Sequence, residues 1–152
     1  MLHNQYVVFK LEEGEYGIDI MNVKEISECP TMTMVPNSPT FIEGVINLRG
    51  NVIPVINLKK KFHLIDTQIK ETSKIIISSL EDNRVGFIVD DASQVLTLMQ
   101  SDIQSRPELL GVINEKYING IAKVEEKLII LIDLLETLTA DEIKSIKDTK
   151  VG

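Results

Sequence analysis

Apolar residues occur along this chain in short runs that are rich in Val and Ile and that end at Gly, Pro, Asn or charged residues. Runs of this kind are typical of β-strands separated by turns. The clearest example extends from Phe41 to Phe62, where the pattern predicts a strand, a tight turn, a second strand and a short helix. The turn is Arg49-Gly50-Asn51, whose Gly and Asn tolerate the positive φ angles that tight turns need. The chain is therefore predicted to consist mainly of short strands.

The same pattern occurs a second time from Tyr117 to Leu138, at a constant offset of 76 residues and without a gap. A fainter repeat at an offset of 69 aligns Tyr16-Gly17-Ile18 with Val85-Gly86-Phe87. Because a glycine inside a strand pattern marks a bulge or a close backbone approach, we expect one at Gly44 and at Gly120. The sequence thus contains a duplicated unit. The positions identical at the larger offset are Ile42/Ile118, Gly44/Gly120, Ile53/Ile129, Ile56/Ile132 and Leu58/Leu134.

The many short strands and few short helices predict an all-β fold, in which two five-stranded barrels pack around a shared core. Barrel closure removes the exposed strand edges that would promote aggregation of a chain rich in Val and Ile. We expect one domain, 1–152, with sub-barrels at about 15–70 and 71–138, an N-terminal strand able to cross between them, and a C-terminal helix and tail at 139–152. That helix is predicted to begin at the capping box Thr139-Ala140-Asp141-Glu142. The predicted core comprises Ile42, Val45, Val55 and Ile56, with Ile118, Ile121, Leu131 and Ile132 from the second copy.

Composition and charge narrow the range of partners. The chain has 152 residues, of which 43% are hydrophobic and 26% charged, as is typical of a globular protein. Its formal net charge of −7 disfavours nucleic acid and anionic lipid surfaces, and its longest apolar run is too short for membrane insertion. The N-terminus shows no export signal and Cys29 is the one cysteine, so we expect a cytoplasmic location. A protein is therefore the expected partner.

The sequence offers little for catalysis or for metal binding. His3 and His63 have no companion ligands or nucleophiles nearby in sequence, and no glycine-rich phosphate loop is present, so we expect no enzyme activity, no cofactor and no metal. Asp90-Asp91 resembles a paired-carboxylate site, which leaves a small hydrolase as one alternative. The favoured interpretation is a solvated strand end, because adjacent residues of a strand point to opposite sides. Lys59-Lys60-Lys61 is interpreted as a solvated helix face.

Arg49 is the main candidate for a functional residue, because the second copy has Glu125 at the same position. When core positions agree between two copies and loop tips differ, the fold resides in the repeats and function in the differences. One interpretation is that Arg49 packs its stem on the barrel or pairs with a local acid. The other is a rigidly mounted guanidinium that binds carboxylates or carbonyls of a partner.

Four segments resemble the CheW family of bacterial chemotaxis adapters, which join receptors to the histidine kinase CheA. The resemblance extends from Tyr6 to about Leu138 and is most specific where Gly-Val-x-Asn-Leu-Arg-Gly is followed by Pro-Val-x-Asn-Leu. It implies two intertwined SH3-like barrels and a non-enzymatic adapter without a cofactor. The implied partners are the regulatory domain of CheA and the cytoplasmic tip of methyl-accepting chemoreceptors, in membrane receptor arrays. The segments are EYGIDIMNVKEI, FIEGVINLRGNVIPVINL, RVGFIVDDASQVL and YINGIAKVEEKLIILIDL.

The resemblance also implies site residues, which are assigned here by matching motifs. The receptor-binding positions are Val23 and Glu25 within NVKEI, Gly44 within IEGV and Arg49 within NLRG. The kinase-binding position is Glu108, which is followed by Leu109 where an aromatic residue is common in the family. The alternative function is a small-ligand-sensing regulatory domain, which would need a cleft between the barrels with converging polar groups.

Overall fold

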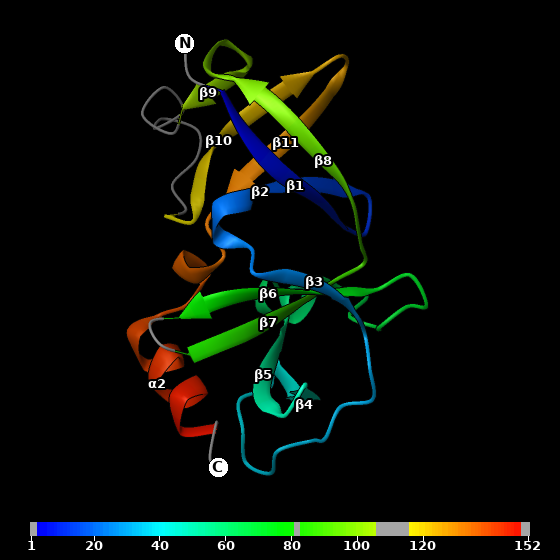
Figure 1. Ribbon diagram of the computed structural model, residues 1–152, viewed down its shortest axis with the longest axis vertical. Coiled ribbons are helices and arrows are strands. Elements are labelled where there is room, and N and C mark those ends of the chain that lie inside the picture. The colour runs from blue at the N-terminus through cyan, green and yellow to red at the C-terminus, as the bar shows by residue number, and fades with distance from the viewer. Residues whose placement is uncertain (1–2, 81–82, 106–115, 150–152) are drawn as a thin grey trace.

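The computed structural model describes residues 3–80, 83–105 and 116–149, which form two β-sheets stacked along the long axis of the molecule (Figure 1). The six-stranded sheet has the order β8-β1-β2-β11-β10-β9, and the five-stranded sheet has the order β3-β6-β7-β5-β4. The six-stranded sheet contains β1 (His3–Leu11), β2 (Gly14–Asp19), β8 (Asp91–Met99), β9 (Ile103–Ser105), β10 (Ile118–Val124) and β11 (Lys127–Ile132). The five-stranded sheet contains β3 (Glu25–Glu28), β4 (Ile42–Leu48), β5 (Asn51–Asn57), β6 (Lys74–Leu80) and β7 (Asn83–Val89).

In the described part of the chain, five helical segments connect or cover the sheets. The 3₁₀ segment η1 (Ile20–Asn22) follows β2, and α1 (Leu58–Lys61) follows β5. The segments η2 (Gln100–Asp102) and η4 (Leu135–Thr137) follow β8 and β11. The last helix, α2 (Ala140–Thr149), begins at the predicted capping box, in which the Thr139 hydroxyl accepts from the Glu142 N–H and the Glu142 carboxylate accepts from the Thr139 N–H. The all-β prediction is confirmed.

Each sheet closes on itself, and the two together form the predicted pair of SH3-like barrels. In the six-stranded barrel, the chain leaves β8 through η2 and enters β9, which pairs with β10 at the far edge of the sheet. In the five-stranded barrel, Thr33 and Val45 exchange two backbone hydrogen bonds of 3.0 and 2.9 Å, which join the chain beyond β3 to β4. The predicted count of five strands holds for one barrel, while the other gains β9.

The two copies of the repeat exchange strands, so the barrels do not follow the expected division at residue 70. The parallel pair Val55–Gly86 joins β5 to β7, and the equivalent pair Leu131–Gly17 joins β11 to β2. Thus β2 belongs to the six-stranded barrel with the second copy, while β6 and β7 belong to the five-stranded barrel with the first. Each copy contributes strands to both barrels, and the chain crosses between them at η1 and between β7 and β8 (Figure 1).

The core has one part that both barrels share and one part inside each barrel. The shared cluster includes Phe9 and Ile132 from the six-stranded sheet, Ile56 and Phe87 from the five-stranded sheet, and Ile146 from α2. A second cluster within the five-stranded barrel contains Ile46, Ile53, Val55, Ile75, Ile77 and Ile88. A third within the six-stranded barrel contains Val8, Leu98, Ala122, Ile129 and Leu131.

Five of the eight predicted core residues are buried, namely Ile42, Val55, Ile56, Leu131 and Ile132. The prediction was wrong for Val45, Ile118 and Ile121, which are only partly buried. Ile118 packs partly buried against the shared core, whereas Val45 and Ile121 are explained by the alternation of β4 and β10, in which the inward positions include the two predicted bulge glycines, Gly44 and Gly120. Val45 and Ile121 follow these glycines and therefore point away from the barrel interior.

The charged residues of α1 and of the β7–β8 connection were predicted to be solvated, and this was wrong. Lys59 is 1% exposed and Asp90 is 6% exposed. Lys60 pairs with Glu43, with Nζ 2.7 Å from Oε1, so the two lysines lie against the protein instead of forming a solvated face. The hydropathy pattern cannot show such burial, because the compensating charges come from distant parts of the chain.

Candidate receptor-binding site

Arg49 lies at the tip of the β4–β5 hairpin, in a turn whose geometry explains its exposure. Leu48 and Asn51 are the last paired residues, so Arg49 and Gly50 form a two-residue loop. Both loop residues have positive φ, 51° for Arg49 and 87° for Gly50, as a hairpin of this length favours. The predicted positive φ is therefore found at Gly50 and at Arg49 itself, and not at Asn51. The Asn47 side chain accepts a 2.9 Å hydrogen bond from the Gly50 N–H, which further holds the loop.

Arg49 makes a two-pronged ion pair with Glu25 of β3. Nη2 of Arg49 contacts Oε1 of Glu25, and Nη1 lies 3.3 Å from Oε2. The Arg49 side chain is 64% exposed and that of Glu25 is 28% exposed, so a partner can reach the guanidinium. Strands β3 and β4 are opposite edges of the open sheet, and barrel closure brings them together. The fold thereby joins two predicted site residues that are 24 positions apart.

The ion pair shifts the pKa of both groups toward the charged forms. The hydrogen bond from Arg49 is the largest cause that lowers the pKa of Glu25, and together with the positive charges of Arg49 and Arg84 it outweighs the opposing effect of desolvation. The hydrogen bond to Glu25 likewise raises the pKa of Arg49. Both side chains are therefore ionised at neutral pH, and the pair presents a guanidinium whose position is fixed by its own carboxylate.

Val23 lies beside Glu25 at the crossing between the barrels. It ends η1, where its N–H donates to the Ile20 carbonyl at 3.1 Å, and it packs partly buried against the shared core. The neighbouring Lys24 N–H bonds the Ile77 carbonyl at 2.7 Å, which continues the edge of β3. The structure therefore brings three predicted site residues together beside the crossing between the barrels. Val23 and Glu25 follow η1 directly, and Arg49 joins them through its ion pair with Glu25.

Gly44, a receptor-binding position by resemblance, is buried where the five-stranded barrel closes. It is buried in β4 at a register shift between Ile42 and Gly44, which confirms the predicted bulge. A Cβ atom at Gly44 would lie 2.4 Å from the Thr33 carbonyl oxygen, so the strand closing the barrel needs a glycine there. Gly120 has the same role in the second copy, because a Cβ there would lie 2.5 Å from the Gln104 carbonyl oxygen.

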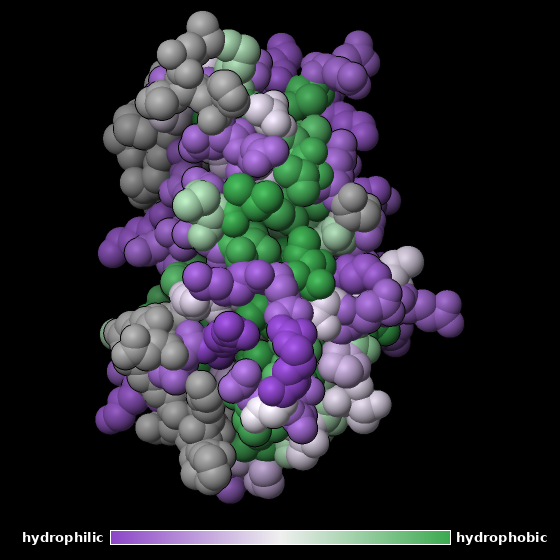
Figure 2. Space-filling model, viewed as in Figure 1, coloured by the Kyte–Doolittle hydropathy of each residue, from purple (hydrophilic) through white to green (hydrophobic). Residues whose placement is uncertain are grey.

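An apolar band runs over β1 and β8 toward the seam between the barrels (Figure 2). Exposed apolar side chains on these elements and on the adjoining η1 include Val95 at 49%, Met99 at 38% and Met21 at 81% exposure. Met21, Ile20 and Thr97 line one hollow of about 360 Å³ with Asn4, Gln5 and Asp19. Contiguous exposed apolar surface marks interaction sites, so this band is a candidate for contact with a partner.

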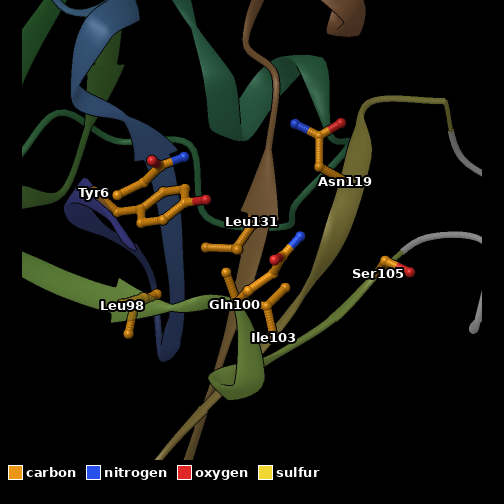
Figure 3. A pocket seen from close by; sticks show the side chains of 8 residues that line it. Tyr6, Leu98, Gln100, Ile103, Ser105, Asn119 and Leu131 are labelled. Carbon is orange, nitrogen blue, oxygen red and sulfur yellow. The ribbon is translucent and has the colours of Figure 1, made fainter. Parts of the chain in front are cut away.

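A second cavity, of about 250 Å³, opens in the six-stranded barrel (Figure 3). Its described lining residues carry amide, hydroxyl and apolar groups and no formal charge. This volume is below the range usual for small-molecule sites, and the lining offers no charged anchor for a ligand. The cavity therefore does not favour the ligand-sensing alternative. The lining residues are Asn4, Tyr6, Leu98, Gln100, Ile103, Ser105, Asn119 and Leu131.

The fold agrees with comparisons to known proteins. A family profile described as a CheW-like domain matches residues 5–142. The chain belongs to the CheW family. The chemotaxis protein CheW of Bacillus subtilis strain 168 is 38% identical over 139 residues, which cover 91% of this chain and 89% of that protein. The chemotaxis protein CheW of Treponema pallidum strain Nichols is 34% identical over 146 residues, which cover 93% of this chain and 86% of that protein.

Comparison with solved structures also indicates the CheW fold. The crystal structure of the scaffolding protein TtCheW from Thermoanaerobacter tengcongensis superposes with a TM-score of 0.78 at 39% sequence identity, covering 87% of this chain and 90% of that chain. The chain is a chemotaxis scaffold protein of the CheW family, as its sequence motifs predicted. In the described part of the chain, no helix is long and apolar enough to cross a membrane, and no group of His, Cys, Asp or Glu side chains is arranged to hold a metal ion.

The predicted kinase-binding residues, Glu108 and Leu109, lie outside the described residues. Sequence reasoning missed another residue of the CheW fold, Asn57, which is fully buried at the end of β5. Its side chain caps α1 by accepting from the Lys59 N–H at 3.0 Å, and it donates to Glu43 Oε1 and to the Thr67 carbonyl at 2.9 Å each. The sequence did contain a signal for Asn57, because the repeat places Asp133 at the equivalent position. Asp133 accepts in the same way from the backbone N–H groups that follow it.

Proposed function

We propose that this chain is a non-enzymatic adapter that links chemoreceptors to the histidine kinase CheA. The observation that carries the proposal is the joining of Glu25 and Arg49 into one exposed ion pair next to Val23. These residues match receptor-binding positions of the CheW family, and only the closure of the five-stranded barrel brings them together. In this proposal the receptor partner is the cytoplasmic tip of a methyl-accepting chemoreceptor, and the complex forms at membrane receptor arrays.

The proposed receptor-binding surface of this chain combines a fixed positive charge with an apolar band. A partner helix can place apolar side chains along the band that includes Met21 and Val95, as in helix-in-groove recognition. Arg49 then contacts a carboxylate or the carbonyl groups at a helix end. Because Arg49 is held by the two-residue turn and by Glu25, its guanidinium loses little conformational freedom on binding.

The kinase partner is proposed to be the regulatory domain of CheA, bound on a separate surface. The family motif assigns this contact to Glu108 and Leu109, in the segment that the second copy of the repeat has gained. An adapter must hold both partners at once, so the two surfaces must act independently. We expect Glu108→Lys or Leu109→Asp to weaken kinase binding while leaving receptor binding nearly unchanged.

Size-exclusion chromatography of mixtures tests the adapter function. The full chain is mixed with a chemoreceptor cytoplasmic fragment, with the CheA regulatory domain, and with both, and each complex is separated by size. We expect binary complexes with each partner and a ternary complex containing all three. If the two partners exclude each other, or if neither binds, the adapter function is contradicted.

A further inference from the structure

A buried ion pair joins α1 to the point where the chain crosses from the five-stranded to the six-stranded barrel. Nζ of Lys59 lies 2.8 Å from Oδ1 of Asp90, and the two side chains are only 2% and 8% exposed. Asp90 stands between β7 of one sheet and β8 of the other, while Lys59 belongs to the helix that follows β5. Lys70 Nζ is a second, half-exposed cation 3.8 Å from Oδ2. The pair therefore lies at the seam between the barrels.

The same two residues also bind two other segments of the chain. Oδ2 of Asp90 accepts a 2.6 Å hydrogen bond from the Glu12 N–H in the β1–β2 turn. Lys59 Nζ donates to the Gln68 carbonyl at 2.9 Å, and the Thr72 hydroxyl donates to the Asp90 carbonyl at 2.9 Å. Asp90 and Lys59 thus connect the β1–β2 turn, the segment 62–73 and the crossover between the sheets.

The segment 62–73 has no helix or strand of its own; Phe62 and Leu64 pack against the shared core, and residues 65–73 are held mainly by polar contacts. Ile65 is fully exposed and Ile69 is 41% exposed, so these apolar side chains contribute little burial. Beyond the bonds to Lys59 and Asp90, the Asp66 N–H donates to Glu12 Oε1 at 3.3 Å. Glu12 itself has a positive φ of 55°, a conformation that needs support from its surroundings.

The charges of the pair compensate each other. Among the described residues, Oδ1 of Asp90 accepts no well-aligned hydrogen bond, so the ammonium of Lys59 is what balances its buried charge. Removing one member of such a pair leaves an uncompensated buried charge, whereas replacing both by apolar groups of similar shape is often neutral or stabilising. Stability alone therefore does not explain why the barrel seam contains a charged pair.

We infer that Lys59 and Asp90 form a clamp that holds the β1–β2 turn and the segment 62–73 against the crossover between the barrels. The clamp acts through the acceptor that Asp90 offers to Glu12 and the donor that Lys59 offers to Gln68. Both contacts need polar atoms at these positions, which an apolar pair of the same shape lacks. This inference does not depend on which partners the adapter binds.

Native-state hydrogen exchange, resolved for single amides of the full chain, tests the clamp. The decisive variant is Lys59→Met combined with Asp90→Leu, because it keeps side-chain shape while removing both charges and both polar contacts. We expect the protection of the Glu12 and Asp66 amides to fall about tenfold or more, while core amides at Ile76 and Ala122 keep their protection within about threefold. Lys74→Met, which removes the lysine of an exposed pair with Glu28, is the matched control and should change neither group.

The alternative outcomes overturn the inference. If the Glu12 and Asp66 amides stay protected in the double variant, the turn and the segment are held by other contacts. If protection falls equally in both sheets, the pair contributes only to global stability. The single variants Lys59→Met and Asp90→Asn should lower the unfolding midpoint more than the double variant does, because each leaves one buried charge alone. If a single variant is as stable as the double variant, the charges do not compensate each other, and the clamp fails.

Discussion

The β4–β5 and β10–β11 hairpins occupy equivalent positions in the two copies of the repeat, and their tips carry opposite charges. Arg49 and Glu125 both have left-handed backbone, with φ of 51° and 57°. Arg49 is paired with Glu25 of β3, whereas the second tip has an exposed lysine, Lys127, 3.7 Å from Glu15 of β2. The same backbone thus presents a fixed guanidinium at one hairpin tip and a carboxylate at the other.

What the two halves share is the geometry that builds each barrel. The Asn57 N–H donates to the Phe41 carbonyl at 2.9 Å, and the equivalent Asp133 N–H donates to the Tyr117 carbonyl at 2.8 Å. Bulges occur at the same glycine in each copy. Since these contacts are duplicated and the tip chemistry is not, the comparison indicates that folding depends on the shared positions, and it supports the proposal that receptor binding depends on the divergent one.

The largest expected effect comes from the equivalent core positions. Ile56 is fully buried and Ile132 is 2% exposed, and both belong to the shared cluster. Ile56→Ala and Ile132→Ala should each reduce the free energy of unfolding by roughly 2 to 5 kcal/mol, through lost burial and the cavity left behind. Chemical denaturation measures the effect. An unchanged midpoint for either variant would show that the two copies do not share a core in the way described.

The bulge glycines should give the next largest effect. An added methyl group at Gly44 or Gly120 would overlap a backbone carbonyl of the closing strand, so Gly44→Ala and Gly120→Ala should each cost about 1 to 3 kcal/mol of unfolding free energy. Gly50→Ala is the control, because no atom lies within 4 Å of its added Cβ and only its positive φ opposes alanine. Its cost should be about 1 kcal/mol. A smaller loss at Gly44 than at Gly50 would contradict the close approach.

The structure shows which parts of the fold and of the candidate site could be predicted from the sequence. The hairpins, the bulge glycines and the turn at Arg49 follow from local pattern and from the repeat. The exchange of β2 and β7 between copies does not, because parallel pairing between distant strands leaves no local trace. The ion pair between Glu25 and Arg49 depends on barrel closure. From the sequence alone, Arg49 was predicted either to pair with a local acid or to bind a partner, and the sequence did not decide between the two.

Arg49→Ala should weaken binding to a chemoreceptor fragment by about tenfold or more, since a held guanidinium is a typical hot-spot group. Arg49→Lys should recover only part of the affinity, because an ammonium cannot make the two-pronged contact. Neither change should shift the melting temperature by more than about 2 °C, given that the side chain is exposed. Isothermal titration calorimetry measures the affinity, and melting curves measure the melting temperature. A large decrease in the melting temperature of Arg49→Ala would show that Arg49 has a structural role instead.

The smallest effect should be the pH dependence of the Glu25 ion pair. Because the folded-state pKa of Glu25 is lowered, its contribution to stability is present above the unfolded pKa of about 4.3 and is lost as the pH falls through the folded value. Melting curves of the wild type and of Glu25→Gln should therefore differ at neutral pH and converge as the pH falls through the lowered folded-state pKa of Glu25. A difference that grows on acidification would contradict the assigned direction.

Exchanging the charges of the two tips tests the central claim most directly. A chemoreceptor cytoplasmic fragment is titrated against the wild type, Arg49→Glu and Glu125→Arg, and the melting temperature of each variant is measured alongside. The two variants alter equivalent positions with the same backbone geometry. We predict that Arg49→Glu loses about tenfold or more in affinity and melts only slightly lower, because its carboxylate then faces Glu25, and that Glu125→Arg stays within about twofold of the wild-type affinity and melts like the wild type. Equal losses from both variants, or full affinity in Arg49→Glu, would show that the difference between the tips does not determine receptor binding.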